Sequence, residues 1–376
     1  MLESKFFAAV YPYNQSFTPY ISYGQLVYGN IEIVQLISPS GFALDGKDGG
    51  ATDKRPDTGI IVSSDFSKAL NDTVNALLIP EGNYESTLYK DIVAKAKVAI
   101  ENKKHILCGT ILNPEDRLCL DAMCTANGVN FISSENITPN YYLRPATPTK
   151  VYRPNASVIF VGEMVEGINA KDVAVGITGY LQSQSYKVAT IMDPGFSQLW
   201  GAYSNKWLFQ NPDGLDDEKR ILAISNFIQQ LDKAEQPDVI VVQIPGGLFK
   251  YNDLYPNQFG IYAFMLSCAI RPDCFICALP YEGYTDEAIK HWSVAVQNRY
   301  GFCIDFLHIS NAFKDLRNLA NLKEINRVFV SQEQVDTLIK SLSVRQPPIV
   351  NALYAMADLG DAVVQLLKSF IDGTTI

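Results

Sequence analysis

The chain has 376 residues, a net charge of -9 and a pI near 5.0. This length is enough for two domains, and the balance of 47% hydrophobic and 19% charged residues is that of a folded globular protein, which excludes a disordered chain. Because the chain is acidic and has no basic run, we expect neither nucleic acid nor an anionic membrane as a partner.

The amino terminus and the cysteines indicate the compartment. MLESKFFAAV lacks a basic region followed by a long apolar core, and no run approaches the roughly 20 apolar residues that span a bilayer. The seven cysteines lie mostly in apolar runs, as buried reduced thiols do. Cys274 and Cys277 form a CxxC inside a predicted strand, whose alternation puts them on opposite faces and disfavours a redox or zinc site. We therefore expect a cytoplasmic protein.

The first 140 residues alternate short apolar strands with amphipathic helices, which predicts a parallel-sheet, Rossmann-like α/β domain. The segment 39–56 is rich in Gly, Asp and Lys and is expected to be a loop or hairpin. No GxGxxG is present, so a dinucleotide is not indicated. The predicted strands are 6–10, 31–37, 59–62, 76–79, 105–108 and 129–133, and the predicted helices are 86–102 and 114–127, the second ended by Gly128.

Four prolines without apolar periodicity between 138 and 154 predict a linker at 141–154, which separates domain 1–140 from domain 155–376. In the second domain we expect strands at 158–161, 187–192, 238–243, 274–279 and 303–308, and helices at 216–233, 257–270 and 286–299, with two more between 332 and 370. The predicted fold class is α/β. It has two three-layer parallel-sheet domains, and the second is P-loop-like with a degenerate glycine loop and extra C-terminal helices.

An aromatic segment follows the second of these strands. It contains Phe196, Trp200, Tyr203, Trp207 and Phe209 at irregular spacing. Two interpretations remain open: the segment packs as additional core, or it forms a lid or peptide groove over the carboxyl edge of the sheet.

The glycine loop after strand 158–161 is the central motif of the chain. Gly162 and Gly167 have the spacing of the two P-loop glycines, and Asn169 can cap the helix that follows. Backbone N–H groups and a helix N-terminus at such a loop favour an anion.

The same loop differs from a P-loop at the two positions whose side chains bind phosphate and Mg²⁺. Ile168 and Asn169 stand where a P-loop has Lys and then Ser or Thr, and Lys171 is displaced by three positions. Glu163 and Glu166 lie inside the loop, where they would repel phosphates. The cofactor therefore stays open between none and ATP or GTP with Mg²⁺, with Lys171 as the candidate phosphate and catalytic residue.

Three further strand ends are expected beside this loop, because ligands of open α/β sheets bind at the carboxyl ends of the strands. The strand that ends in Gln243, Gly246 and Gly247 resembles the Walker B strand of dethiobiotin-synthetase-like P-loop proteins, but a neutral amide replaces its acid. Asp193 and Glu282, at the other two ends, are the alternative metal contacts.

No nucleophile elbow is visible in the sequence. His308, at the end of a predicted strand, is the acid–base candidate, and a structural role is its alternative.

Three groups of residues carry a resemblance to a known family. They are YPYN at Tyr11 to Asn14, the run from Asp193 to Phe209, and PDVIVVQIPGG with the later FGIYAF and ALPYEGY. Together they resemble the peptide maturation system proteins encoded beside radical-SAM peptide maturases in clostridia. The second half is also distantly similar to dethiobiotin synthetase. The closer resemblance implies a role in making a ribosomally synthesised, modified peptide (RiPP), with the precursor peptide or the maturase as partner.

Three functions are consistent with these observations. The first is an accessory protein for peptide maturation with a degenerate nucleotide site. The second is an enzyme that uses ATP or GTP to activate a carboxylate or amide, with Lys171 and Asn169 at the phosphates. The third is a small-molecule-binding protein that uses the same crevice. The sequence leaves a homo-oligomer open.

Overall fold

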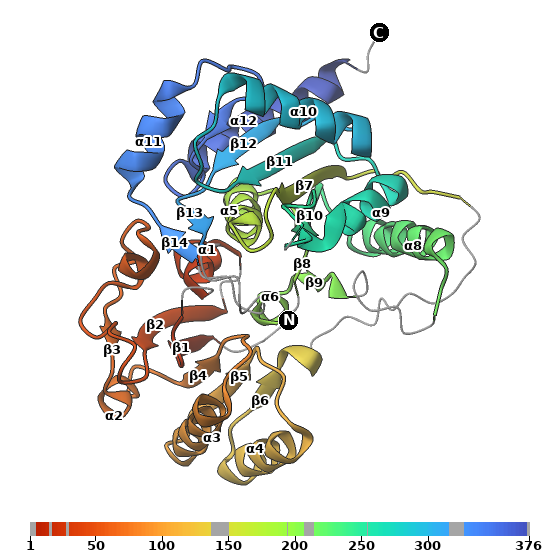
Figure 1. The fold of residues 1–376 in the computed structure, drawn as a ribbon. Coiled ribbons are helices and arrows are strands. Elements are labelled where there is room, and N and C mark those ends of the chain that lie inside the picture. Colours follow the sequence, from red (N-terminus) through yellow and green to blue (C-terminus); the bar gives the residue numbers. More distant parts are fainter. Residues whose placement is uncertain are drawn as a thin grey trace. The chain divides into compact units, whose positions relative to one another are not determined.

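The computed structural model describes residues 5–14, 17–27, 30–136, 150–193, 195–206, 214–253, 255–315 and 327–373. The chain divides into two compact units (Figure 1). The first unit comprises Met1–Pro139 and Pro194–Ser204, and the second unit comprises Asn140–Asp193 and Asn205–Ile376. Most of the predicted linker, 141–154, lies outside the described residues. Within these ranges no helix is both long and apolar enough to cross a membrane.

The first unit contains a parallel sheet with the strand order β3-β2-β1-β4-β5-β6. This is the order of a doubly wound Rossmann sheet, in which right-handed crossovers place helices on both faces. The elements are β1 (Phe6–Val10), α1 (Thr18–Val27), β2 (Ile31–Ile37), β3 (Val62–Ser63), α2 (Phe66–Ala69), β4 (Ala76–Ile79), α3 (Ser86–Glu101), β5 (His105–Cys108), α4 (Pro114–Asn127) and β6 (Phe131–Ser133).

Local sequence signals explain most of these boundaries. The Asn113 side chain accepts a hydrogen bond from the Asp116 N–H, Pro114 occupies the first turn of α4, and Gly128 ends the helix at φ +70°. The predicted stop at Gly128 is therefore confirmed. The strand expected at 59–62 is shorter and lies further along the chain, and α1 was not predicted.

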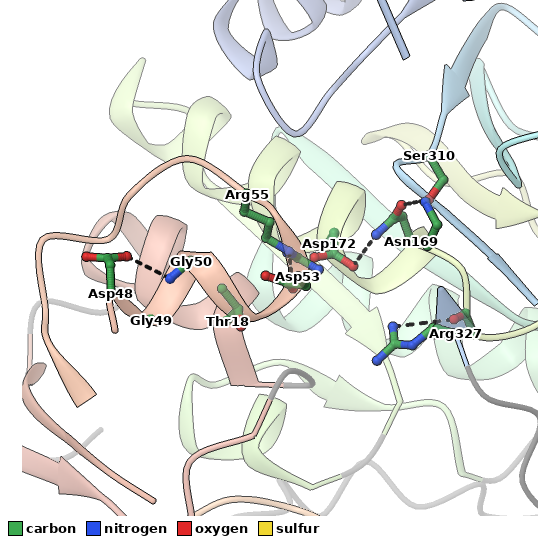
Figure 2. Close-up of polar contacts among 12 residues, drawn as sticks. Thr18, Asp48, Gly49, Gly50, Asp53, Arg55, Asn169, Asp172, Ser310 and Arg327 are labelled. Carbon is green, nitrogen blue, oxygen red and sulfur yellow. Dashed lines mark hydrogen bonds and ion pairs between the residues drawn. The ribbon is translucent and has the colours of Figure 1, made fainter. Parts of the chain in front are cut away.

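Asp48 organises the segment predicted as a loop or hairpin. One of its carboxylate oxygens accepts a hydrogen bond from the Gly50 N–H at 2.7 Å (Figure 2). The same oxygen accepts one from the Thr58 N–H (2.8 Å), and the other oxygen accepts one from the Gly59 N–H (2.9 Å). A short 3-10 helix, η2 (Gly49–Asp53), begins directly after Asp48. A single carboxylate thus joins the beginning and the end of the stretch 48–59.

The aromatic segment packs as core within the first unit. Phe196, in α6 (Phe196–Leu199), lies 4.7 Å from Phe17 and 4.9 Å from Tyr20 between ring centroids, and Trp200 stacks on Tyr20 at 5.9 Å. Phe196 and Trp200 are buried. The sequence predicts this segment in the second domain, whereas residues 195–204 belong to the first unit. Trp207 and Phe209 lie outside the described residues.

The strands of the second unit form a parallel sheet in the order β15-β12-β11-β7-β10-β8. The elements are β7 (Ser157–Glu163), α5 (Ala170–Ser183), β8 (Val188–Met192), α8 (Asp217–Glu235), β10 (Val239–Gly247), η4 (Asn257–Gly260), α9 (Ile261–Ala269), β11 (Cys274–Leu279), α10 (Asp286–Tyr300), β12 (Phe306–Ile309), β13 (Ala312–Lys314), β14 (Arg327–Phe329), α11 (Gln332–Ser341), β15 (Ile349–Val350) and α12 (Met356–Gly373). The central strands are almost wholly apolar and buried, as expected for strands covered on both faces.

Helices cover both faces of this second sheet. α5 packs on β7, β8 and β10 and is joined by α12, while α9 packs on β10 and contacts α8 and α10. The chain moves one way along the sheet from β7 to β8 and then back through β10, β11 and β12, so right-handed crossovers put α5 on the face opposite α8, α9 and α10. The predicted three-layer α/β class is confirmed, including the additional C-terminal helices α11 and α12.

Candidate functional site

The glycine loop leaves the sheet at the end of β7, between β10 and β11. Glu163, the last residue of β7, pairs with Gly247 on one side and Ala278 on the other. Gly162 lies within the strand, and a Cβ there would come within 3.1 Å of the Phe275 ring. Gly167 adopts φ +76°, which turns the chain into α5.

The Glu163 carboxylate occupies the anion position of its own loop. One oxygen accepts a short hydrogen bond from the Gly167 N–H, and the other accepts hydrogen bonds from Ile168 (2.9 Å), Asn169 (3.0 Å) and Ala170 (3.0 Å). Successive N–H groups at a helix N-terminus form a nest for anions, the feature with which a P-loop cradles phosphate. Glu163 therefore does more than repel a phosphate from nearby, because its carboxylate fills the nest.

Burial sets the protonation of this carboxylate. Glu163 is 5% exposed, and burial raises its pKa to about 7, although the N–H groups of the loop and the charge of Lys314 act in the opposite direction. The carboxyl group is thus partly protonated near neutral pH.

Cations reach the loop from the β13–β14 hairpin, which the sequence analysis did not predict. Lys314 lies 3.8 Å from the position that a Gly167 Cβ would take, and it donates a hydrogen bond to the Tyr255 hydroxyl at 2.8 Å. Burial lowers the pKa of Lys314, while Glu163 and Glu166 raise it. Arg327 lies opposite Lys314 in the ladder, and its guanidinium approaches the Gly167 carbonyl at 3.5 Å (Figure 2).

Ile168 and Asn169, which stand at the positions of the P-loop Lys and Ser/Thr, contact the protein interior instead of an open phosphate site. Ile168 is 1% exposed, within the apolar core. Asn169 precedes α5 without capping it: its amide donates to Asp172 (3.1 Å), and its oxygen accepts a short hydrogen bond from the Ser310 hydroxyl (Figure 2). Lys171 is half-buried in the first turn of α5, beyond the last N–H that binds Glu163.

His308 is fully buried in β12 and supports this arrangement. Its Nδ1 accepts a hydrogen bond from the Ala352 N–H (3.1 Å), so the ring proton lies on Nε2, which faces the Asn169 side-chain oxygen at 3.4 Å. This geometry matches the structural alternative for His308, in which it positions Asn169 from a site closed to solvent.

Gln243 binds Asp193 through both atoms of its amide. The amide nitrogen donates to one Asp193 oxygen at 2.9 Å, and the amide oxygen accepts from the Asp193 N–H at 3.1 Å. Asn205 donates to the other Asp193 oxygen at 3.1 Å. These contacts connect the end of β8 with the end of β10. They also give each oxygen of Asp193, a candidate metal contact, a hydrogen-bond donor from the protein.

Gly246 and Gly247 make room for Asn257, which sequence reasoning did not select. A Cβ on Gly247 would lie 1.8 Å from the Asn257 amide nitrogen, and Gly246 has φ +67°. Asn257 donates to the Met164 carbonyl at 2.7 Å and accepts from the Glu166 N–H at 2.8 Å. The glycine turn therefore holds the glycine loop in place through one buried amide.

Glu282 lies apart from these contacts. It is exposed and accepts a hydrogen bond from the Tyr251 hydroxyl at 2.8 Å. Across the described ranges, no group of three or more His, Cys, Asp or Glu side chains is placed to hold a metal ion. Among the described residues, neither Asp193 nor Glu282 therefore belongs to such a group.

The fold and this loop define an α/β protein whose second unit has, at the end of β7, an anion nest that holds an internal carboxylate. No protein-family model matches the chain, and no curated protein matches its sequence. Among solved structures, it is similar to a DUF1611 family protein from Anabaena variabilis, with 12% identity, a TM-score of 0.57, and coverage of 96% of this chain and 100% of that one. At this identity the likeness shows the fold alone.

Two dehydrogenases match part of the chain at lower scores. They are an amine dehydrogenase from Mycobacterium smegmatis (20% identity, TM-score 0.29, 40% of this chain and 46% of that one) and a scyllo-inositol dehydrogenase from Lactobacillus casei (9% identity, TM-score 0.27, 43% and 46%). At these scores they carry no argument about function.

Proposed function

We propose that this chain is a cytoplasmic accessory protein in the maturation of a ribosomally synthesised, modified peptide, which binds the precursor peptide or its maturase. Its glycine loop is then a degenerate nucleotide site. The observation that carries this proposal is the Glu163 carboxylate in the nest, bonded to four successive backbone N–H groups. A nucleotide phosphate would have to displace it without the P-loop lysine, because Ile168 stands there.

The environment of Gln243 also supports a non-hydrolysing protein. A P-loop enzyme holds Mg²⁺ with an acid near this strand end, whereas here a neutral amide binds the Asp193 carboxylate. Both features favour binding over ATP- or GTP-dependent activation of a carboxylate or amide.

The test combines nucleotide and partner titrations on the purified full chain. We expect no heat of binding with ATP or GTP at millimolar concentration, with or without Mg²⁺, and a measurable affinity for a precursor peptide or its maturase. Mg²⁺-dependent nucleotide binding that is lost in Lys171→Ala would overturn the proposal in favour of the enzyme.

One observation favours a second candidate, a protein that binds a small anionic molecule at the same loop. Lys314 and Arg327 place two cations beside Gly167. For this candidate, binding of inorganic phosphate or a small carboxylate should strengthen in Glu163→Ala, which empties the nest, and weaken in Lys314→Gln.

A further inference from the structure

A strained backbone turn lies directly before α9. Asn257, Gln258 and Phe259 have φ angles of +53°, +59° and +55°, and Gly260 follows at +69°. Residues with a Cβ rarely take this left-handed conformation, because the Cβ comes too close to a carbonyl oxygen. The other non-glycine residues with positive φ in the described part of the chain occur singly. Residues 257–260 therefore form a strained segment, named here the left-handed turn, and such strain persists only where the surrounding contacts hold it.

The contacts of Asn257 connect this turn to the glycine loop. Its side chain is buried, and the amide nitrogen donates to the Met164 carbonyl at 2.7 Å and to the Phe249 carbonyl at 2.6 Å. The amide oxygen accepts a hydrogen bond from the Glu166 N–H at 2.8 Å. Gly167, whose N–H is the first donor of the anion nest, is the next residue along the chain. The conformation of the turn and the order of the nest are therefore linked through one side chain.

The outer part of the left-handed turn has contacts of its own. A Cβ on Gly246 would lie 2.7 Å from the Gln258 Cγ, so the chain has a glycine where the Gln258 side chain crosses it. The Arg299 guanidinium donates a hydrogen bond to the Phe259 carbonyl at 2.6 Å. Neighbouring elements thus stabilise a conformation that the residues of the turn disfavour by themselves.

The same residues have a right-handed alternative without this strain. Pro256 before the turn and Ile261 after it already have helical angles, φ -71°, ψ -15° and φ -61°, ψ -43°. If 257–260 took that conformation, α9 would begin one turn earlier, with Pro256 in its first turn, where proline is favoured. The Asn257 side chain would then leave its partners, because its Cα–Cβ bond would point in another direction. Strain and the contacts of Asn257 thus favour opposite conformations.

We propose that the left-handed turn is a latch on the glycine loop. In the left-handed form Asn257 holds the loop closed, and a switch to the right-handed form, which extends α9, releases it. Release removes the partners of the Met164 carbonyl and the Glu166 N–H and loosens the nest beside them. The latch is a two-state element of the kind through which proteins control a site, and it acts whichever partner or ligand the protein binds.

Hydrogen exchange of residues 164–170, measured by mass spectrometry on the purified full chain, tests the latch. Gln258→Gly and Gln258→Ala both remove the side chain beyond Cβ. Only glycine also relieves the left-handed strain and disfavours the right-handed helix. We expect exchange in 164–170 to be at least about fivefold slower in Gln258→Gly than in Gln258→Ala, the factor that corresponds to one strained residue.

Asn257→Ala should have the opposite effect. It removes three hydrogen bonds of the left-handed form, so exchange in 164–170 should become about tenfold faster or more. Strand β11 (274–279) is the internal reference, and its exchange should stay unchanged.

Equal exchange in the two Gln258 variants would overturn the proposal, because the strain would then have no influence on the loop. Faster exchange of Asn257→Ala in β11 to the same degree as in 164–170 would also contradict it, since the whole second unit would then unfold together. If Asn257→Ala does not fold, the Gln258 pair still decides. Neither readout involves a peptide or a maturase, so failure of the latch and failure of the proposed function are distinguishable.

Discussion

Replacing Glu163 with Gln tests the description of the occupied nest, because Gln keeps one acceptor oxygen for the loop but cannot titrate, while its amide nitrogen meets the Gly167 N–H as a second donor. The Glu163 pKa rises from 4.5 to about 7 on folding. Between these values the folded chain keeps a proton that the unfolded chain has released. Unfolding therefore releases a proton, and rising pH destabilises the wild-type fold.

The magnitude follows from the same two values. A rise from 4.5 to about 7 corresponds to roughly 3 kcal/mol, at about 1.4 kcal/mol for each pKa unit. The wild-type free energy of unfolding should thus lose about 2–3 kcal/mol between pH 5 and pH 8 through this residue. The donor–donor contact in Glu163→Gln has the same cost at every pH. The free energy of unfolding of this variant relative to the wild type should therefore rise by about 2–3 kcal/mol from pH 5 to pH 8.

Urea unfolding followed by circular dichroism at pH 5, 6, 7 and 8 measures this difference. Glu166→Gln is the matched control, since it removes a half-buried carboxylate of the same loop that accepts a long hydrogen bond from the Tyr255 hydroxyl at 3.5 Å. Its pH profile should run parallel to that of the wild type. A Glu163→Gln profile that also runs parallel would refute the raised pKa and with it the account of the buried carboxylate.

The remaining predictions concern the supports of the two units. Asp48→Ala should destabilise the first unit by about 1–3 kcal/mol, because the N–H groups of Gly50, Thr58 and Gly59 lose their acceptor, and an unchanged urea midpoint would contradict this. Gly247→Ala should cost about 1–3 kcal/mol and increase hydrogen exchange in the glycine loop, since its Cβ would overlap Asn257. Iodoacetamide should label only the three exposed thiols before unfolding, which mass spectrometry would show; modification of a buried thiol in the native protein would contradict it. The exposed cysteines are Cys119, Cys268 and Cys303.

The sequence predicted those elements whose signals are local. The run at 158–161 indicated a strand buried on both faces, and the caps around 114–127 indicated a complete helix, because apolar runs and capping residues act within a few positions of the chain. α1 and the β13–β14 hairpin were missed. The two strands of the hairpin, Ala312–Lys314 and Arg327–Phe329, are three residues each, too short for alternation to identify them.

The sequence by itself determined that the glycine loop departs from a P-loop, since the residue types at Ile168 and Gln243 can be read directly. It also placed Glu163 in the loop as an acid unfavourable to phosphate. Only the tertiary structure decided that this acid fills the nest, because the four N–H groups converge on one carboxylate once Gly167 has turned the chain into α5. Lys314 comes from a strand about 150 positions further on, and its approach to Gly167 depends on long-range packing that no local pattern records.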